Sequence, residues 1–386
     1  MRAATTVIPF GRPMIGDEER DAVAEVLAGS TLSHGPRGHD FEEAFAAFTG
    51  APHAIATSSC AAALHLSYLG LGIGPGDEVI VPAQTHVATA HVVEACGAKP
   101  VFVYCDPVGN IDLDAAAAAV TERTRALSVV HYLGLPVDMT RAVELARKHD
   151  LFLVEDCALA LGATWDGTHT GLHGDVGCFS FYPVKHITTT EGGMAISRRA
   201  DVAEKLAKQR AFGIDRTVVA ERRHSSAYDV ELLGLNYRMS ELNAAIGVEQ
   251  LRKLPSFLAA RERNARAIKA ALEGHPVVRV LDTTGGGSAR ASFYALEAVL
   301  EGPLGARRDE VIEALKQNGL GVSIHYPRPV PLTTYYRNAY GYTDGQFPNA
   351  ERISNESITL PVGPHISESD AERVVEILTV TVEELA

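Results

Sequence analysis

The chain is organised around a stretch that reads FSFYPVKHITTTEGG from Phe179 to Gly193. A short apolar strand brings Lys185 near its end, a threonine-rich loop follows, and Gly192 and Gly193 turn the chain into a second apolar run at 194–197. Apolar walls desolvate a lysine and favour its neutral, nucleophilic amine, which condenses with aldehydes. Most lysines lie on surface loops, so this stretch alone leaves a plain surface lysine as the alternative.

Apolar strands and helices alternate on the N-terminal side of this stretch. The predicted strands are 53–57, 78–82, 100–104, 126–130, 151–155 and 177–181, and the predicted helices between them are 61–71, 85–95, 113–120 and 140–149. This order predicts an α/β fold, with a mostly parallel sheet covered by helices on both faces in three layers. Ligands of such sheets bind beyond the carboxyl ends of the strands. Ser58, Gln84, Asp156 and Lys185 all fall near predicted strand ends.

The flanking regions predict a second, smaller unit. Before the sheet, an irregular arm at 1–16, a helix at 17–27 and a turn at Gly35-Pro36-Arg37-Gly38 lead to Phe41, Phe45 and Phe48, whose helical spacing indicates core packing. After it, the expected elements are helices 201–212, 238–254, 257–272, 308–317 and 369–385, a polar loop at 213–234, strands 277–281, 293–299 and 322–325, and a flexible tip at 285–287. Ser367 and Asp370 form a capping box pattern. We therefore expect a large domain over 1–255 and a smaller α+β domain over 256–386.

Composition excludes several classes of protein. The 386 residues are 46% hydrophobic and 22% charged, as in soluble globular proteins, and the net charge of −13 disfavours nucleic-acid binding. No run of 18 apolar residues and no signal-peptide pattern occurs, so we expect no membrane association and a cytoplasmic location. The five cysteines form no C-x-x-C pair and the 15 histidines no H-E-x-x-H, so no metal site is expected.

Several residues meet the needs of pyridoxal 5'-phosphate (PLP). This cofactor takes a lysine for its aldehyde, a carboxylate for its pyridine nitrogen, donors for its phosphate and walls for its ring. Lys185 suits the first need, and Asp156, after the apolar run 151–154, suits the second. Ser59-Cys60-Ala61 begins a predicted helix, whose free N–H groups favour an anion. Ser180 could add a hydroxyl, and His86 could lie against the ring.

Each of these assignments has a plainer alternative. Asp156 at a strand end is about as often a helix cap or half of a buried ion pair. His86 at a helix start is more often a cap or a core group. Small residues such as those at 58–61 begin many helices. The PLP hypothesis therefore depends on the candidate residues taken together, since they all fall at one predicted edge of the sheet.

Taken together, the residues resemble the DegT/DnrJ/EryC1/StrS family of nucleotide-sugar aminotransferases. The resemblance covers nearly the whole chain. It is carried by Gly35-Pro36 with Phe41-Glu42, AAALHL at 61–66, GPGDEVIVP at 74–82, GAKPVFV at 97–103, EDCA at 155–158, GCFSF at 177–181, the lysine loop ending in EGG at 191–193, NYRMSEL at 236–242 and AAIG at 244–247. The lysine loop and the last two segments are specific, whereas the Gly-Pro-Gly-Asp turn alone is not.

The resemblance implies a fold, a cofactor and roles. The fold would be the aspartate-aminotransferase-like architecture (PLP fold type I). Lys185 would bind PLP as an internal aldimine and shuttle a proton, and Asp156 would pair with the ring nitrogen. The cofactor would be held by Ser59, Cys60, Ala61, His86 and Ser180, and by Asn236 reaching the phosphate of a neighbouring subunit. His325 and Tyr326 match a stretch near the sugar, and the working unit would be a homodimer with a shared active site.

Two positions depart from the family pattern. Leu159 stands where Gln or His usually binds the ring hydroxyl, and Ala61 stands where a threonine is usual. Neither change removes the amine or the carboxylate. A branch of the family replaces the lysine by histidine and acts as a nucleotide-sugar 3-dehydratase; here Lys185 stands in that column and His186 follows it.

We therefore expect a PLP-dependent aminotransferase. It would move an amino group from L-glutamate to a nucleotide-linked keto-deoxysugar, a 4-keto-6-deoxyhexose by resemblance, in deoxyamino sugar biosynthesis for glycosides or lipopolysaccharide O-antigen. The alternatives are the PLP/PMP-dependent nucleotide-sugar 3-dehydratase of the same family and a catalytically inactive PLP-binding regulator, toward which Leu159 points. A Rossmann dehydrogenase is disfavoured because no G-x-G-x-x-G follows the first strand.

Overall fold

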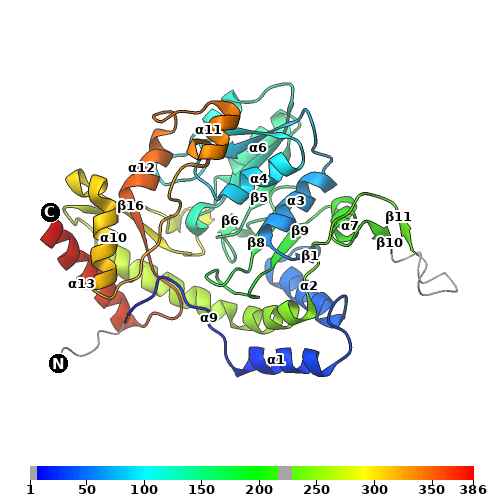
Figure 1. The fold of residues 1–386 in the computed structure, drawn as a ribbon, viewed down its shortest axis with the longest axis horizontal. Helices are drawn as coiled ribbons and strands as arrows, with labels where there is room; N and C mark the ends of the chain where they lie inside the picture. The colour runs from blue at the N-terminus through cyan, green and yellow to red at the C-terminus, as the bar shows by residue number, and fades with distance from the viewer. Residues whose placement is uncertain (1–6, 216–227) are drawn as a thin grey trace.

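A seven-stranded sheet forms the middle layer of the molecule (Figure 1), with the order β1-β9-β8-β5-β4-β2-β3. The computed structural model describes residues 7–215 and 228–386; the beginning of the predicted arm at 1–16 and the middle of the predicted loop at 213–234 lie outside the described residues. The strands are β1 (His53–Thr57), β2 (Glu78–Pro82), β3 (Lys99–Val103), β4 (Thr124–Val130), β5 (Phe152–Asp156), β8 (Val176–Ser180) and β9 (Gly193–Ser197).

The sheet is mostly parallel, as the sequence predicts. Strands β3, β2, β4, β5 and β8 run parallel, whereas β9 is antiparallel to both β8 and β1. The predicted strands 53–57 and 78–82 coincide with β1 and β2. Three of the other four are shifted by one residue, and β4 begins two residues earlier than predicted. The strand ends that carry the candidate residues are therefore where the sequence puts them.

Helices cover both faces of the sheet, which confirms the three-layer α/β/α prediction. On one face lie α3 (Cys60–Gly70), α4 (Val87–Ala95) and α7 (Ala200–Gln209), which pack against side chains such as Val154 of β5. The neighbouring side chain, Leu153, points to the opposite face. That face is covered by α2 (Pro36–Thr49), α5 (Leu113–Ala118), α6 (Met139–Lys148) and the first half of α9 (Glu241–Ala271).

The predicted turn at 35–38 is wrong, because Pro36 begins α2. Gly35 is the residue before the first helical turn. The carboxylate of Glu241, the first residue of α9, accepts from the backbone N–H groups of Arg37 (2.8 Å) and Gly38 (3.1 Å). Proline is favoured at this first helical position because the N–H it lacks would have no helical partner. Phe41 and Phe45 are buried in the core, as predicted.

The two helices predicted at 238–254 and 257–272 are one continuous helix, α9, with Pro255 inside it. α9 packs against α1 (Asp17–Ala28) and α2 at one end and against the C-terminal helix α13 (Glu368–Leu385) near the other (Figure 1). The predicted division into domains at residues 255 and 256 falls within this helix. That division stays a prediction.

A smaller antiparallel sheet joins β12 (Val278–Val280), β15 (Leu296–Leu300) and β16 (Ser357–Leu360). The predicted strand at 322–325 is wrong, because only Ser323 forms a bridge there, to Thr359. β16 was not predicted. α10 (Arg308–Gln317) and α13 cover this sheet, and the capping box of Ser367 and Asp370 is present at the start of α13.

The glycines at 285–287, predicted as a flexible tip, belong to a hairpin. β13 (Gly285–Gly286) pairs with β14 (Ala289–Arg290), which pairs in turn with β6 (Thr164–Trp165) and through it with β7 (Thr168–His169). The remaining elements are β10 (Ile214–Asp215), β11 (Asp229–Val230), α11 (Thr334–Tyr340), α12 (Pro348–Glu356) and the short turns η1 (Tyr132–Gly134), η2 (Gly302–Arg307) and η3 (Val330–Leu332). Across the described ranges, no helix combines the length and the apolar character needed to cross a membrane.

Candidate active site

Most of the candidate residues line one pocket at the carboxyl ends of the central strands. Asp156 is the last residue of β5 and Ser180 the last of the adjacent parallel strand β8. Lys185 follows in the loop after β8. The pocket has a volume of about 280 Å³, and its candidate residues are Ser59, Cys60, Ala61, His86, Asp156, Ser180, Lys185 and Tyr326.

Two of the predicted residues do not line this pocket. Asn236 is exposed, and its Oδ1 accepts from Nε of Arg238 at 2.9 Å. His325 lies behind the pocket wall formed by Tyr326, with its Nδ1 3.0 Å from Oγ1 of Thr359. The sequence therefore places eight of the ten predicted residues around a single hollow.

The N-terminus of α3 contributes backbone N–H groups to the pocket. Ser59 precedes the helix, and its Oγ accepts from the N–H of Ala62 at 3.0 Å. The N–H groups of the first helical turn, which include Cys60 and Ala61, have no helical acceptor and lie at the positive end of the helix dipole. A Cβ on Gly193 of β9 would lie only 2.3 Å from the carbonyl carbon of Ser59, so this close approach requires glycine.

Asp156 is held by two hydrogen bonds. Its Oδ1 accepts from the N–H of Ala158 (3.0 Å), and its Oδ2 accepts from Oγ1 of Thr89 on α4 (2.8 Å), which also contacts Oγ1 of Thr85 at 2.8 Å. Asp156 is buried and lines the pocket, so its carboxylate is an oriented acceptor for a ring N–H. Sequence reasoning missed Thr89. The available signal was the spacing of four between Thr85 and Thr89, although Thr85 itself lies just before α4.

Lys185 is a desolvated amine. Burial lowers its pKa to about 8, although the Cys60 thiol and the Asp156 carboxylate act in the opposite direction. Its Nζ lies 5.1 Å from the centroid of the Tyr294 ring. Arg261 of α9 binds the carbonyl of Lys185 (3.4 Å) and the carbonyl of Tyr294 (2.8 Å). Arg261 and Tyr294 were not predicted, because nothing local in the sequence relates them to Lys185.

Rings and one leucine form the remaining walls. His86 is the residue before α4, and its Nδ1 accepts from the N–H of Ala88 at 3.2 Å, so the plainer alternative of a helix cap applies. Its ring centroid lies 5.6 Å from that of Tyr326 at an angle of 66°. Leu159 lines the pocket with an apolar side chain. These features fit PLP, because an anion site, a buried carboxylate, an amine and flat walls converge in one hollow.

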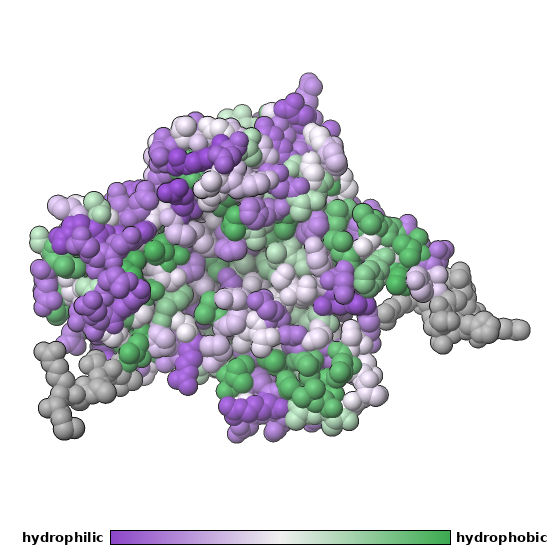
Figure 2. Space-filling model, viewed as in Figure 1, coloured by the Kyte–Doolittle hydropathy of each residue, from purple (hydrophilic) through white to green (hydrophobic). Residues whose placement is uncertain are grey.

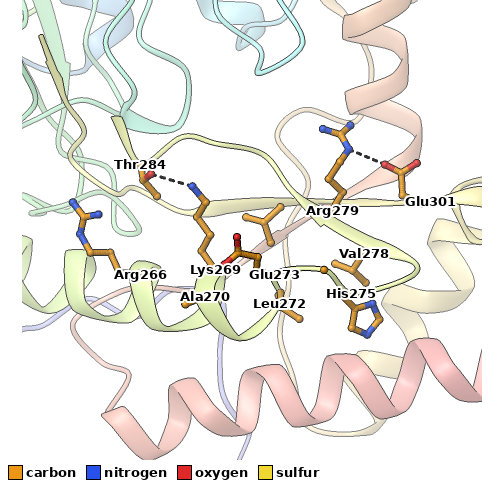
Figure 3. A pocket seen from close by; sticks show the side chains of 12 residues that line it. Arg266, Lys269, Ala270, Leu272, Glu273, His275, Val278, Arg279, Thr284 and Glu301 are labelled. Atoms are coloured by element: carbon orange, nitrogen blue, oxygen red, sulfur yellow. Dashed lines mark hydrogen bonds and ion pairs between the residues drawn. The ribbon is translucent and has the colours of Figure 1, made fainter. Parts of the chain in front are cut away.

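A larger hollow of about 710 Å³ lies elsewhere, between the C-terminal end of α9 and β12 (Figure 3). Its cations are paired with neighbours: Lys269 contacts Asp282 (2.5 Å) and Thr284 (3.3 Å), and Arg279 contacts Glu301 (2.8 Å). None of the predicted site residues lines it. The convergence of polar groups, rather than size, therefore makes the smaller pocket the candidate site.

A buried group of His131, Glu155 and Cys157 has ligand atoms close enough for a metal. The imidazole of His131 and the carboxylate of Glu155 are engaged in hydrogen bonds. The carboxylate of Glu155 contacts Nε2 of His131 (3.0 Å) and accepts from the N–H groups of Gly171, His173 and Gly174, and Nδ1 of His131 accepts from the N–H of Val137 (3.1 Å). The group thus fixes the loop after β7 against β5.

The fold and the pocket define a PLP-dependent enzyme of fold type I. The chain belongs to the DegT/DnrJ/EryC1/StrS aminotransferase family, whose sequence profile matches residues 13–379, and the members of this family are PLP-dependent sugar aminotransferases. The resemblance inferred from the sequence is thereby confirmed.

Individual relatives are similar to this chain in sequence or structure over nearly its full length. The spore coat polysaccharide biosynthesis protein SpsC of Bacillus subtilis is 38% identical over 375 residues, which are 96% of this chain and 95% of SpsC. Helicobacter pylori PseC, an aminotransferase involved in pseudoaminic acid biosynthesis, superimposes with a TM-score of 0.91 at 26% identity, covering 98% of this chain and 100% of PseC. Spr1654 of Streptococcus pneumoniae, solved in a PLP form and a PMP form, gives a TM-score of 0.93 at 28% identity for the PMP form, covering 98% and 100%.

Proposed function

We propose that this protein transfers an amino group from L-glutamate to a nucleotide-linked keto-deoxysugar, a 4-keto-6-deoxyhexose. The observation that carries the proposal is the position of the Lys185 amine, which shares one pocket with Asp156 beyond two adjacent strands. The aminated sugar would enter glycoside or lipopolysaccharide O-antigen biosynthesis in the cytoplasm.

Each residue has a role that follows from its chemistry. Ser59, Cys60, Ala61 and Ser180 hold the phosphate, and Asp156 holds a proton on the ring nitrogen. PLP, when bound, accepts the electron pair left behind as a C–H proton is removed. Lys185 provides the amine that binds the cofactor, and, once freed, it takes that proton as a base. With a pKa of about 8, an appreciable fraction of the amine is neutral at cytoplasmic pH.

The neighbouring histidine argues against the dehydratase alternative. His186 is buried and directs Nε2 to the carbonyl of Ser292 at 3.1 Å, outside the residues that line the pocket. The position of Lys185 in the pocket, with His186 bonded outside it, supports Lys185 as the reactive residue. Borohydride reduction of the PLP-loaded protein should fix the cofactor on Lys185. A label found on another lysine would overturn the assignment.

The inactive-regulator alternative rests on Leu159, and one experiment separates it from an enzyme. Incubating the PLP-loaded protein with L-glutamate should convert the cofactor to its pyridoxamine form and release 2-oxoglutarate. The pyridoxamine form should then react with one member of a panel of UDP-, GDP- and dTDP-linked keto-sugars. Retention of the PLP spectrum with glutamate would favour the regulator.

We also propose a homodimer in which Asn236 reaches the neighbouring active site. Oδ1 of Asn236 is engaged by Arg238, which leaves its amide N–H groups as donors for an anion. Apolar surface lies over α1 and over the paired strands β10 and β11 (Figure 2), where Leu27, Val230 and Leu233 are exposed. Hybrids of K185A and N236A chains should regain activity, because one of the two sites then has both residues. Inactive hybrids would contradict a shared site.

A further inference from the structure

A chain of hydrogen bonds connects the C-terminal sheet to the wall of the pocket. Glu297 on β15 is fully buried, and its Oε2 accepts from Oγ1 of Thr359 on β16 at 2.8 Å. The same Oγ1 lies 3.0 Å from Nδ1 of His325. The next residue, Tyr326, lines the pocket. Glu297 is therefore two hydrogen bonds and one peptide unit away from the pocket wall.

The hydroxyl of Ser357 indicates the protonation state of Glu297. Its Oγ lies 2.5 Å from the carbonyl oxygen of Ile353 and also contacts Oε1 of Glu297. A hydroxyl has one hydrogen to donate. If Ser357 donates to Glu297, two oxygens face each other at 2.5 Å with no hydrogen between them. If it donates to Ile353, the contact with Oε1 requires a proton on Glu297, and both contacts are satisfied.

The surroundings of Glu297 favour the protonated form. Burial raises its pKa to about 8, although the hydroxyls of Ser357 and Thr359 and the charge of Arg308 lower it. The titratable groups that act on it or bond to its partners are Arg308 at the start of α10, Tyr132 of η1, His325 and Tyr326. On α12, Arg352 and Glu356 pair with each other on the exposed side.

We propose that Glu297 is a neutral carboxylic acid and a positioning residue that holds the Tyr326 wall of the pocket in place for the sugar. Its proton is donated to Ser357, Thr359 donates to its other oxygen, and Nδ1–H of His325 donates to Thr359. His325 is thereby kept as one tautomer. Its carbonyl accepts hydrogen bonds from Nε2 of Gln84 (2.9 Å) and the hydroxyl of Tyr132.

The proposal rests on the proposed function in one respect, namely that a sugar contacts this wall. The protonation state is tested without substrate. The infrared difference spectrum of the PLP-loaded wild type minus E297Q should contain the carbonyl stretch of a protonated carboxylic acid at pH 6. The band should disappear as the pH rises through about 8. A carboxylate band at pH 6 would overturn the proposal.

The hydrogen-bond relay from Glu297 through Thr359 to His325 is tested with paired variants of Thr359. In ¹⁵N-histidine spectra, with the His325 signal assigned by its absence in H325Q, wild type and T359S should show the Nδ1–H tautomer. T359V should show a mixture, because the acceptor is gone. T381V is the matched control, since it removes a buried threonine hydroxyl of α13 that contacts Asn318 instead. Identical tautomers in T359V and wild type would refute the relay.

If the relay positions the Tyr326 wall, its loss should impair the half-reaction with the sugar and spare the half-reaction with L-glutamate. In T359V the KM for whichever sugar of the panel is accepted should rise about tenfold, the equivalent of one buried hydrogen bond, and T359S should reverse the change. Conversion of the cofactor by L-glutamate should stay within about twofold of wild type. An equal loss in both half-reactions would contradict a role at the sugar wall. If no sugar is accepted, the proposed function fails, while the infrared and ¹⁵N results still decide the state of Glu297.

Discussion

Thr89 donates a hydrogen bond from Oγ1 to Oδ2 of Asp156 at 2.8 Å, although the two residues lie 67 positions apart in the chain. The bond joins α4 to the end of β5 and fixes the plane of the carboxylate. Because the second oxygen of Asp156 accepts from Ala158, the carboxylate cannot rotate without breaking a bond. An oriented carboxylate suits a ring nitrogen whose position is set independently by the phosphate.

Replacing Thr89 with valine, which has nearly the same shape, should weaken PLP binding. A hydrogen bond to a charged group contributes roughly 1.5–3 kcal/mol, so we expect the dissociation constant to rise at least about tenfold. Titration of the apoprotein with PLP, followed by absorbance, measures the change. T89S keeps the hydroxyl and should bind like wild type. Equal affinity of T89V and wild type would show that the bond does not orient Asp156 for the cofactor.

The reaction of the apoprotein with PLP should depend on pH through Lys185. Only the neutral amine attacks the aldehyde, and burial lowers the pKa of Lys185 to about 8. The rate should therefore rise with pH up to about 8 and level off above it. Stopped-flow absorbance from pH 6 to pH 10 tests this, with K185R as the variant that should not react. A rate still rising steeply at pH 10 would mean that the amine is not desolvated.

Replacing Glu155 with glutamine should destabilise the fold by about 3 kcal/mol, because the variant loses charge-assisted bonds in a buried site. Burial alone would raise the pKa of Glu155, but the bonds and charges of His131 and the loop amides lower it below 4.5. A depressed pKa contributes stability above pH 4.5 that is lost as the pH falls through the folded-state value. The gap between wild type and E155Q in urea unfolding should thus narrow in acid.

The control for that measurement is E313Q, which alters an exposed pair with Lys316 and should change the free energy of unfolding by less than about 0.5 kcal/mol. A difference between E155Q and wild type that stays constant as the pH falls from 7 to well below 4.5 would argue against ionisation of Glu155 as the source of stability.

Replacing Gly193 with alanine should disturb the phosphate site. The new Cβ would lie 2.3 Å from the carbonyl carbon of Ser59 and 2.5 Å from the nitrogen of Cys60, so backbone must move. Such overpacking costs about 1–3 kcal/mol, and we expect weaker PLP binding together with a lower melting temperature. Gly286→Ala is the control, because nothing lies within 4 Å of its Cβ. Unchanged PLP affinity in G193A would show that this contact does not shape the site.

The buried strands could be predicted because both faces of each are covered, so they read as short continuous apolar runs such as VIV at 79–81. The positions of Asp156, Ser180 and Lys185 followed from the same runs, because each residue lies at or shortly after one. Because the carboxyl ends of parallel strands lie at the same edge of a sheet, these residues could be predicted to lie near one another. The local sequence was sufficient to predict those strands whose structure follows from burial on both faces.

The missed features depend on contacts that are distant in the sequence. Proline reads as a turn, yet Pro36 begins a helix whose N–H groups are satisfied by Glu241. Pro255 stays inside α9 because core packing on both sides outweighs one lost hydrogen bond. The strand β16 exists because β15 lies beside it. Arg261, Tyr294 and Thr89 likewise acquire their roles only when distant segments meet.

Arg261 donates hydrogen bonds to the carbonyls of Lys185 and of Tyr294, which lies just before β15, and this has a consequence for protein engineering. The reactive loop and the small sheet are fastened to the same guanidinium, so neither can be repositioned alone. Redesign of the pocket for bulkier acceptors should therefore vary residues that lie away from Arg261 and leave Arg261 unchanged. Removing the hydrogen bonds of Arg261 would widen the pocket and at the same time misalign the Lys185 amine.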